Sequence, residues 1–145
     1  MALSKPDGTP EFAVLPIPGQ GPWREALPQL HPGNRRVCVR QRIVEESETR
    51  NVYWTVYEPG MILRQHTHAC DQITHLIEGE FWSGDTLCKA PAVLVLEKGA
   101  KFGPVVAGPA GAVLLEVFLG PTPSTPTDLP GYHRLLEEKG VKLLG

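Results

Sequence analysis

Residues 60–80, GMILRQHTHACDQITHLIEGE, place three histidines and a glutamine in a stretch that otherwise has the pattern of β-strands. Successive side chains of a strand point to opposite faces, so His66 and His68 leave the same face. Two imidazoles on one face can offer two nitrogen ligands to a single metal ion. Histidine pairs at this spacing are also common on protein surfaces, so the surrounding sequence has to decide between the two interpretations.

Segments with strand character lie on both sides of this stretch. Alternating or β-branched residues are separated by Gly, Pro, Asp and Ser, which are typical of turns. The segments are 36–44, 50–58, 61–68, 72–79, 80–84, 92–97, 101–106 and 111–120. About eight short strands joined by tight turns predict an all-β sandwich or barrel.

The two ends of the chain differ from this central region. Residues 1–35 are rich in proline, which predicts an irregular N-terminal arm. Residues 121–131, PTPSTPTDLPG, are too rich in proline to sustain a strand ladder, and YHRLLEEKG at 132–140 predicts a short helix ending at Gly140. We therefore expect an arm over 1–35, a barrel over 36–120, and a linker with a C-terminal helix over 121–145.

Composition argues against several classes of protein. The 145 residues fit one domain, and 14 basic against 16 acidic residues give a net charge of -2 without a basic block. No apolar run approaches the roughly 20 residues of a bilayer span, and the N-terminus lacks the order of a secretory signal. The three cysteines show no CxxC spacing and are expected to be reduced. We expect a cytoplasmic protein with neither nucleic acid nor membrane as a partner.

The spacing of the central stretch resembles the first motif of the cupin family, G-x5-H-x-H-x(3,4)-E-x6-G. Gly60, His66, His68 and Gly79 match this motif. By strand pattern the resemblance covers residues 36–119. It implies a small double-stranded β-barrel, the RmlC-like jelly roll, with a metal ion in the mouth of the barrel.

Two positions depart from the cupin pattern. Gln72 stands where the first motif usually has Glu, and alignment of Gly99 with the second motif puts Phe102 at the place of the third histidine. The resemblance thus implies one divalent transition-metal ion (Mn, Fe, Ni, Co or Zn) held by His66, His68 and Gln72. Because these donors are neutral, they would hold the ion less tightly but leave it a stronger Lewis acid.

Other residues could contribute to the site. His75 is a possible ligand, although strict alternation puts it on the face opposite Gln72 unless a bulge intervenes. Asp71 would offer a carboxylate if the register shifted by one residue. Phe102 either closes the pocket as an apolar wall or marks a site that has lost its metal. Arg64 has the strand parity of His66 and either lines the pocket, where it could pair with a substrate carboxylate, or lies in solvent.

These features favour a metal-dependent enzyme, a dioxygenase or a lyase, that acts on a small organic molecule inside the barrel. The degraded second motif keeps open a non-catalytic cupin that binds or senses a small ligand. An isomerase or epimerase is less supported, because the general bases it needs are not identifiable. We also expect a homodimer, because the aromatic strand at 50–58 would otherwise form an exposed edge.

Overall fold

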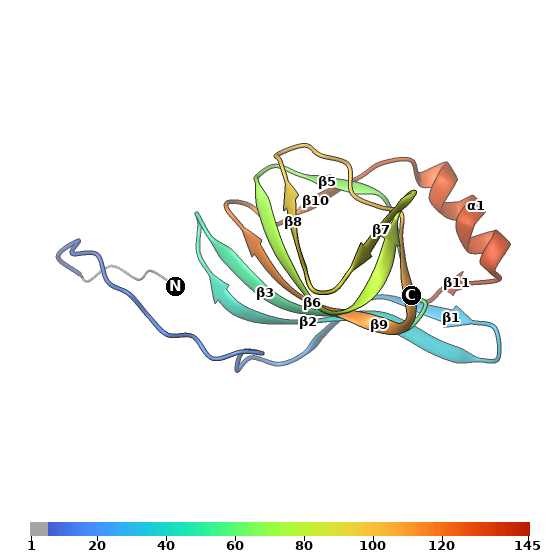
Figure 1. The fold of residues 1–145 in the computed structure, drawn as a ribbon, viewed down its shortest axis with the longest axis horizontal. Helices are drawn as coiled ribbons and strands as arrows, with labels where there is room; N and C mark the ends of the chain where they lie inside the picture. The colour runs from blue at the N-terminus through green and yellow to red at the C-terminus, as the bar shows by residue number, and fades with distance from the viewer. Residues whose placement is uncertain (1–5) are drawn as a thin grey trace.

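Antiparallel strands make up most of the chain in the computed structural model, which describes residues 6–145 (Figure 1). The elements are β1 (Arg24–His31), β2 (Arg35–Glu46), β3 (Asn51–Tyr57), β4 (Ile62–Leu63), β5 (His66–His68), β6 (Gln72–Ser83), β7 (Thr86–Lys89), β8 (Ala92–Leu96), β9 (Val105–Phe118), β10 (Ser124–Pro126), α1 (Leu129–Lys139) and β11 (Lys142–Leu143). This architecture confirms the predicted all-β class with one short C-terminal helix.

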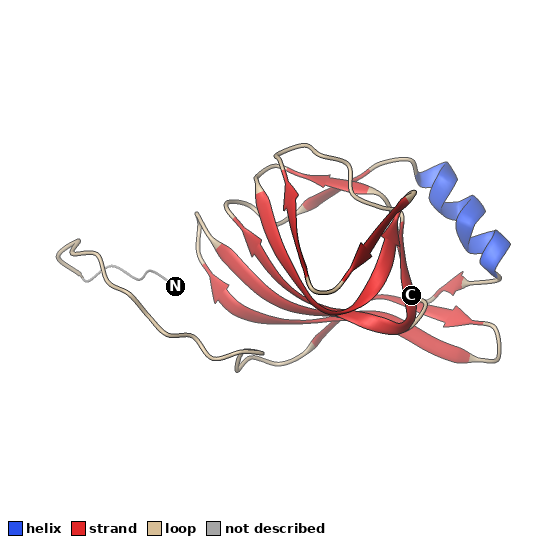
Figure 2. Cartoon of the chain, in the orientation of Figure 1, coloured by secondary structure: helices blue, strands red, loops and turns tan. Residues whose placement is uncertain are grey.

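The strands form one large curved sheet and one small one (Figure 2). The large sheet has the order β11-β1-β2-β3-β9-β6-β7, with β4 also paired to β9 and β8 also paired to β6. Strands β5 and β10 pair with each other in the small sheet, and together they lie across the opening of the curved sheet (Figure 1). The result is a barrel with an interior that both sheets line.

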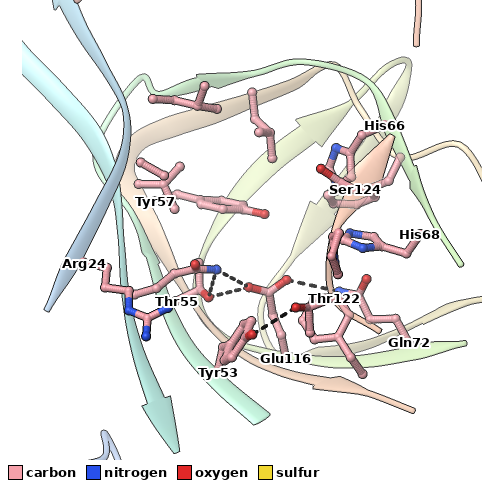
Figure 3. Close-up of a pocket in the computed structure, with 18 of the residues that line it drawn as sticks. Arg24, Tyr53, Thr55, Tyr57, His66, His68, Gln72, Glu116, Thr122 and Ser124 are labelled. Carbon is pink, nitrogen blue, oxygen red and sulfur yellow. Dashed lines mark hydrogen bonds between the residues drawn. The ribbon is translucent and has the colours of Figure 1, made fainter. Parts of the chain in front are cut away.

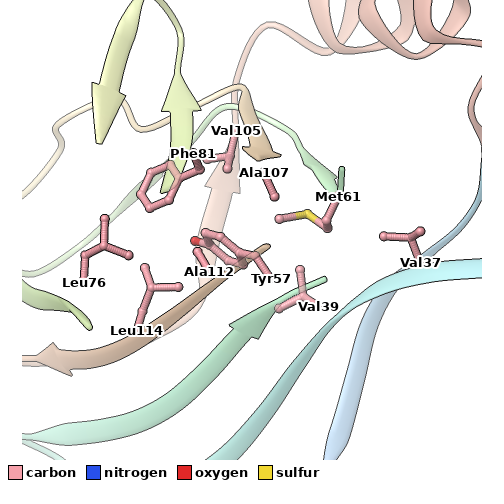
Figure 4. Packing of buried hydrophobic residues seen from close by; sticks show 10 residues of the cluster. All are labelled: Val37, Val39, Tyr57, Met61, Leu76, Phe81, Val105, Ala107, Ala112 and Leu114. Atoms are coloured by element: carbon pink, nitrogen blue, oxygen red, sulfur yellow. The ribbon is translucent and has the colours of Figure 1, made fainter. Parts of the chain in front are cut away.

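The interior of the barrel follows from the alternation of side chains along each strand. In β6, Gln72, Thr74 and Leu76 are buried, while Ile73 and His75 are exposed. An apolar cluster fills one part of the interior (Figure 4), made of Val37, Val39, Tyr57, Met61, Leu76, Phe81, Val105, Ala107, Ala112 and Leu114. Val39 and Tyr57 of this cluster also line the cavity described below, so the core is the floor of the functional site.

Gly79, the last glycine of the first motif, lies where β6 and β9 approach each other most closely. Its φ is 79°, a conformation that side chains with a Cβ rarely adopt. A Cβ at this position would lie 2.0 Å from the carbonyl oxygen of Gly111 on β9. The register of the two strands shifts on both sides of Gly79, which identifies it as the bulge that bends β6.

The prediction of an irregular arm over residues 1–35 is wrong for its last third. Residues 24–31 form β1, which pairs with β2, and a bulge between Ala26 and Gln29 contains Leu27 at φ 51° and Pro28. Proline is tolerated at such a bulge because no ladder hydrogen bond is required there. Within the described part of the chain, residues 6–23 are irregular; the predicted arm also included residues 1–5, which lie outside the described residues.

The segment after the barrel also differs in part from expectation. Ser124–Pro126 pair with β5 despite the surrounding prolines, so the prediction that this linker forms no ladder is wrong. The predicted helix end is confirmed, because Gly140 follows α1 at φ 65° and its N–H bonds back to the carbonyl of Glu137. The only described helix is too short and too polar to cross a membrane.

The aromatic strand at 50–58 is not an edge. It contains β3, which pairs on one side with β2 and on the other with β9. Exposed apolar side chains lie on other strands of the sheet, among them Ile73 on β6 and Val93 and Val95 on β8. Residues 50–58 therefore do not form the exposed edge from which we predicted a homodimer.

Candidate metal centre and small-molecule cavity

A cavity of about 410 Å³ occupies the barrel (Figure 3). Side chains from β1, β2, β3, β5, β6 and β9 line it, together with residues 122–124. Pockets for small organic ligands usually have a volume of about 300–1,000 Å³ and mix apolar walls with a few polar groups. The cavity has this size and character, and both histidines of the first motif face it.

His66 and His68 lie side by side on β5. This short strand is held by β10 on one side and by a bridge between His66 and Phe102 on the other. The centroids of the two imidazoles are 5.0 Å apart and their planes are nearly perpendicular, at 86°. The two-residue spacing therefore brings both rings to one wall of the cavity.

His66 is oriented by a backbone carbonyl. Its Nδ1 lies 3.0 Å from the carbonyl oxygen of Arg64, which only accepts hydrogen bonds, so Nδ1 carries the proton and Nε2 keeps its lone pair. Burial lowers the pKa of His66 and favours the neutral ring. An imidazole fixed by a carbonyl in this way is the usual arrangement of a metal-ligating histidine.

His68 has a buried ring nitrogen without a partner. Among the described residues, Nδ1 forms no hydrogen bond. Burial and the neighbouring His66 lower the pKa of His68, while hydrogen bonding of the ring to the backbone of Thr122 and Pro123 opposes this shift. Since a buried nitrogen without a partner is unfavourable, a ligand or an ion near His68 would stabilise this wall of the cavity.

The amide of Gln72 is held from two sides. Nε2 donates to the hydroxyl of Thr74 at 2.8 Å and to the carboxylate of Glu116 at 3.1 Å. Both amide hydrogens are thereby used, so the carbonyl oxygen is the free polar atom of this side chain. Figure 3 shows Gln72 beside His68 with this oxygen on the histidine side.

Glu116, a residue that sequence reasoning missed, provides a carboxylate inside the barrel. It lies on β9, is buried, and accepts hydrogen bonds from the Thr55 hydroxyl, Gln41 Nε2 and Gln72 Nε2. Burial raises the pKa of Glu116, and the three hydrogen bonds oppose that rise. The signal in the sequence is its parity with Leu114 and Phe118, which puts a carboxylate on the inner face of an apolar strand.

Phe102 and Arg64 both line the cavity. The Phe102 ring stands against His66 and against Phe81, with centroids 5.8 Å away in each case. An apolar ring thus stands beside His66, at the residue that we aligned with the histidine of the second motif. Arg24, on β1, is a second cation of the lining that the sequence did not reveal, because β1 was not predicted.

His75 and Asp71 do not reach the cavity. His75 is exposed on the outer face of β6, as strict alternation requires, since no bulge separates it from Gln72. Asp71 is exposed, and its carboxylate accepts a hydrogen bond from the backbone N–H of Lys98 at 2.8 Å. Neither possible additional ligand is brought to His66 and His68.

The available donors can be compared with the needs of a metal ion. No three His, Cys, Asp or Glu side chains among residues 6–145 group closely enough to hold an ion between them. The donor set is instead two neutral imidazoles with an unpartnered ring nitrogen on His68, and the free amide oxygen of Gln72. Nitrogen and oxygen donors of this kind fit a divalent transition-metal ion with open coordination positions.

Solved structures share the fold of this chain at low sequence identity. An acetylacetone dioxygenase from Acinetobacter johnsonii is 19% identical over 90% of this chain and 87% of its own, with a TM-score of 0.60. The polyketide cyclase RemF from Streptomyces resistomycificus is 16% identical over 63% and 72%, with a TM-score of 0.54. An uncharacterized Klebsiella pneumoniae protein with a double-stranded β-helix domain is 22% identical over 61% and 83%, with a TM-score of 0.51.

No protein-family model and no curated protein matches this sequence. At these identities the structural matches establish the fold, and the reaction has to be argued from the site. The antiparallel barrel, the short helix and the structural matches agree with the architecture that the first motif implies. The chain therefore has the small double-stranded β-barrel, or jelly-roll, fold of the cupins.

Proposed function

We propose that this protein is a metal-binding cupin that acts on a small organic molecule inside its barrel. The observation that carries the proposal is the pair of imidazoles, His66 and His68, on one wall of the cavity inside the barrel. His66, His68 and the amide oxygen of Gln72 would hold the ion. A divalent ion bound by neutral donors would supply Lewis acidity toward an oxygen atom of the substrate.

The residues of the chain itself would bind and orient that substrate. Tyr57 is 3% exposed and its hydroxyl, which forms no hydrogen bond within residues 6–145, points into the cavity (Figure 3). It is therefore placed to donate a hydrogen bond to a substrate oxygen. Phe102 and Phe118 provide apolar walls that exclude water, and Arg24 and Arg64 would attract an anionic group.

A dioxygenase-like or lyase reaction is the chemistry that we favour. The similar structures include an acetylacetone dioxygenase and a polyketide cyclase. The name of the first indicates a small carbonyl compound as its substrate, and the name of the second indicates a polyketide. The cavity of about 410 Å³ is large enough for a compound of this size and offers aromatic surface together with hydrogen-bonding groups. We accordingly propose a small carbonyl or phenolic compound as the substrate.

Metal uptake is the test of this proposal. Protein purified without a histidine tag should contain, or take up on soaking, about one equivalent of a transition metal. The variants H66A and H68A should lose this uptake. The variant H75A is the matched control. His75 lies on β6, the strand that also carries Gln72, but its side chain is exposed outside the cavity, so H75A should retain the metal. Less than about a tenth of an equivalent in the unmodified protein after soaking would contradict the proposal.

A second function is favoured by Phe102. With an apolar ring beside His66, the cavity has one ligand fewer than an ordinary cupin centre and would suit a container that binds or senses a small molecule. A ligand that raises the melting temperature equally in the unmodified protein and in H66A/H68A would favour this function over metal-dependent catalysis.

A further inference from the structure

Within the cavity, the amide of Gln72 donates a hydrogen bond to the carboxylate of Glu116. The ordinary cupin motif has its carboxylate at position 72, on β6. In this chain an amide stands there, and a carboxylate lies directly behind it on β9, 3.1 Å from Nε2. Because both are buried, the charge of Glu116 is held within the barrel rather than in solvent.

Glu116 is itself fixed from the side opposite Gln72. Gln41 Nε2 donates to the Thr55 hydroxyl at 3.0 Å, and this hydroxyl donates to Oε1 of Glu116. Oε1 also accepts from Gln41 Nε2, and only Oε2 faces Gln72. Gln41 on β2 and Thr55 on β3 therefore fix the position of the Glu116 carboxylate independently of its contact with the Gln72 amide.

The orientation of the Gln72 amide follows from these contacts. An amide can turn over and exchange its oxygen for its nitrogen, but here the nitrogen faces two acceptors, the hydroxyl of Thr74 and the carboxylate of Glu116. A turned amide would set its oxygen against the carboxylate of Glu116, with no hydrogen between them. The oxygen is thus kept on the side of His68.

We infer that Glu116 is a positioning residue which, through Gln72, turns a neutral oxygen donor toward His66 and His68. The inference rests on the proposed metal site for its purpose, but the locked amide is a property of the chain without metal. This role also accounts for a glutamine at position 72. The carboxylate of Glu116 lies on the far side of the Gln72 amide and acts on the site through that amide, without being a ligand.

The hydrogen bond between Gln72 and Glu116 predicts how the protein responds when the amide and the carboxylate exchange places. Q72E alone would set two carboxylates against each other without a donor between them. E116Q alone would oppose an NH2 group to the NH2 of Gln72 or to the donors Thr55 and Gln41, unless the amide of Gln72 turns over and accepts from the new NH2 group, which takes its oxygen away from His68. In the double variant Q72E/E116Q, the new amide donates to the new carboxylate and its oxygen still accepts from Thr55. Q72E is therefore expected to break the network, E116Q to keep it only with a turned Gln72 amide, and the double change to restore it.

The test is a double-mutant cycle on the full-length protein with two measurements. In the presence of a chelator, Q72E should melt about 5 °C or more below the unmodified protein, and Q72E/E116Q should recover most of that loss. For Co²⁺, read from its visible absorption spectrum, E116Q should bind about 10–100-fold more weakly, as expected for a lost contact behind a ligand. Q72E/E116Q should bind at least as tightly as the unmodified protein. E97Q, which alters an exposed carboxylate, is the control and should change neither measurement.

The outcomes separate this inference from the proposed function. If Q72E/E116Q melts as far below the unmodified protein as Q72E does, the hydrogen bond between residues 72 and 116 does not orient the amide, whatever the metal does. If the double variant is rescued but E116Q binds Co²⁺ as tightly as the unmodified protein, the carboxylate is structural and the inference is overturned. If the chelated proteins show the rescue and no variant binds Co²⁺, the proposed metal function fails while the orientation of Gln72 by Glu116 stands.

Discussion

The ring of Phe102 stands edge to face against the imidazole of His66, with centroids 5.8 Å apart and planes at 81°. Two backbone hydrogen bonds of 2.9 Å join the same pair of residues. An apolar side chain is therefore built into the wall beside the first histidine, at the residue that we aligned with the histidine of the second cupin motif. If the proposed metal site exists, Phe102 limits the number of its ligands.

F102H should convert the cavity into a site with three imidazoles. Because the backbone of residue 102 is already bonded to that of His66, the new ring should lie beside His66, and the affinity for Co²⁺ or Zn²⁺ should rise about tenfold or more. Isothermal titration calorimetry measures this directly. The control F102L, which removes the aromatic ring without adding a ligand, should not tighten binding. An unchanged affinity in F102H would show that residue 102 does not face the metal position.

G79A should be among the most damaging small substitutions in this protein. The new methyl group would lie 2.0 Å from the carbonyl oxygen of Gly111, so β6 and β9 would have to separate. G99A is a matched control, since Gly99 has φ 82° against 79° for Gly79 but no atom within 4 Å of its Cβ position. Strain at positive φ should cost G99A about 1–2 kcal/mol in the free energy of unfolding, and G79A should lose at least about 2 kcal/mol more. Urea denaturation of both variants measures the difference, and equal losses would contradict the close approach of the two strands.

His31 should make the stability of the fold depend on pH. Its Nε2 lies 3.0 Å from Oε1 of Gln29, and Arg35 faces its Nδ1. Burial, and then the charge of Arg35, lower the pKa of His31 below 6.5 in the folded state. In the unfolded chain His31 therefore binds a proton at a higher pH than in the folded chain. The free energy of unfolding decreases as the pH falls below about 6.5, and His31 contributes at most ~1.4 kcal/mol per pH unit to this decrease.

Denaturation curves of H31Q and of the unmodified protein between pH 8 and pH 5 test this dependence. The loss on acidification should be smaller in H31Q, although it should not vanish, because burial also lowers the pKa values of His66 and His68. At pH 8 the imidazoles are neutral in both states, so that pH gives the effect of the substitution alone. An identical loss in the two proteins would show that His31 does not contribute.

The barrel and part of its site could be predicted because their signals are local. Alternation along 72–79 assigns Gln72 to the inner face and His75 to the outer face, and the structure has both there. The helix end at Gly140 was likewise readable from one residue with a special backbone requirement. Such features depend on a few neighbours in the chain and need no knowledge of the sheet order.

The remaining features depend on contacts between distant segments. β1 escaped prediction because Pro28 within it and Pro22 and Pro32 beside it mask a strand that is interrupted by a bulge at Leu27 and Pro28. β3 was taken for an edge, since nothing in residues 50–58 reveals that β9 pairs with it from more than fifty residues away along the chain. Glu116 gained its role only when β9 brought it against Gln72 and Thr55. The alternation of side chains along 111–120 could have predicted that Glu116 is buried, but it could not have predicted that Gln72 and Thr55 contact it.

Anomalous scattering from crystals soaked in Co²⁺ or Mn²⁺, recorded at the absorption edge of the metal, would show whether His66 and His68 bind a metal ion. We expect one strong peak inside the barrel, about 2.0–2.2 Å from a ring nitrogen of both His66 and His68, with the oxygen of Gln72 facing it. A barrel without a peak, or peaks only at exposed histidines such as His75, would contradict the proposed metal site.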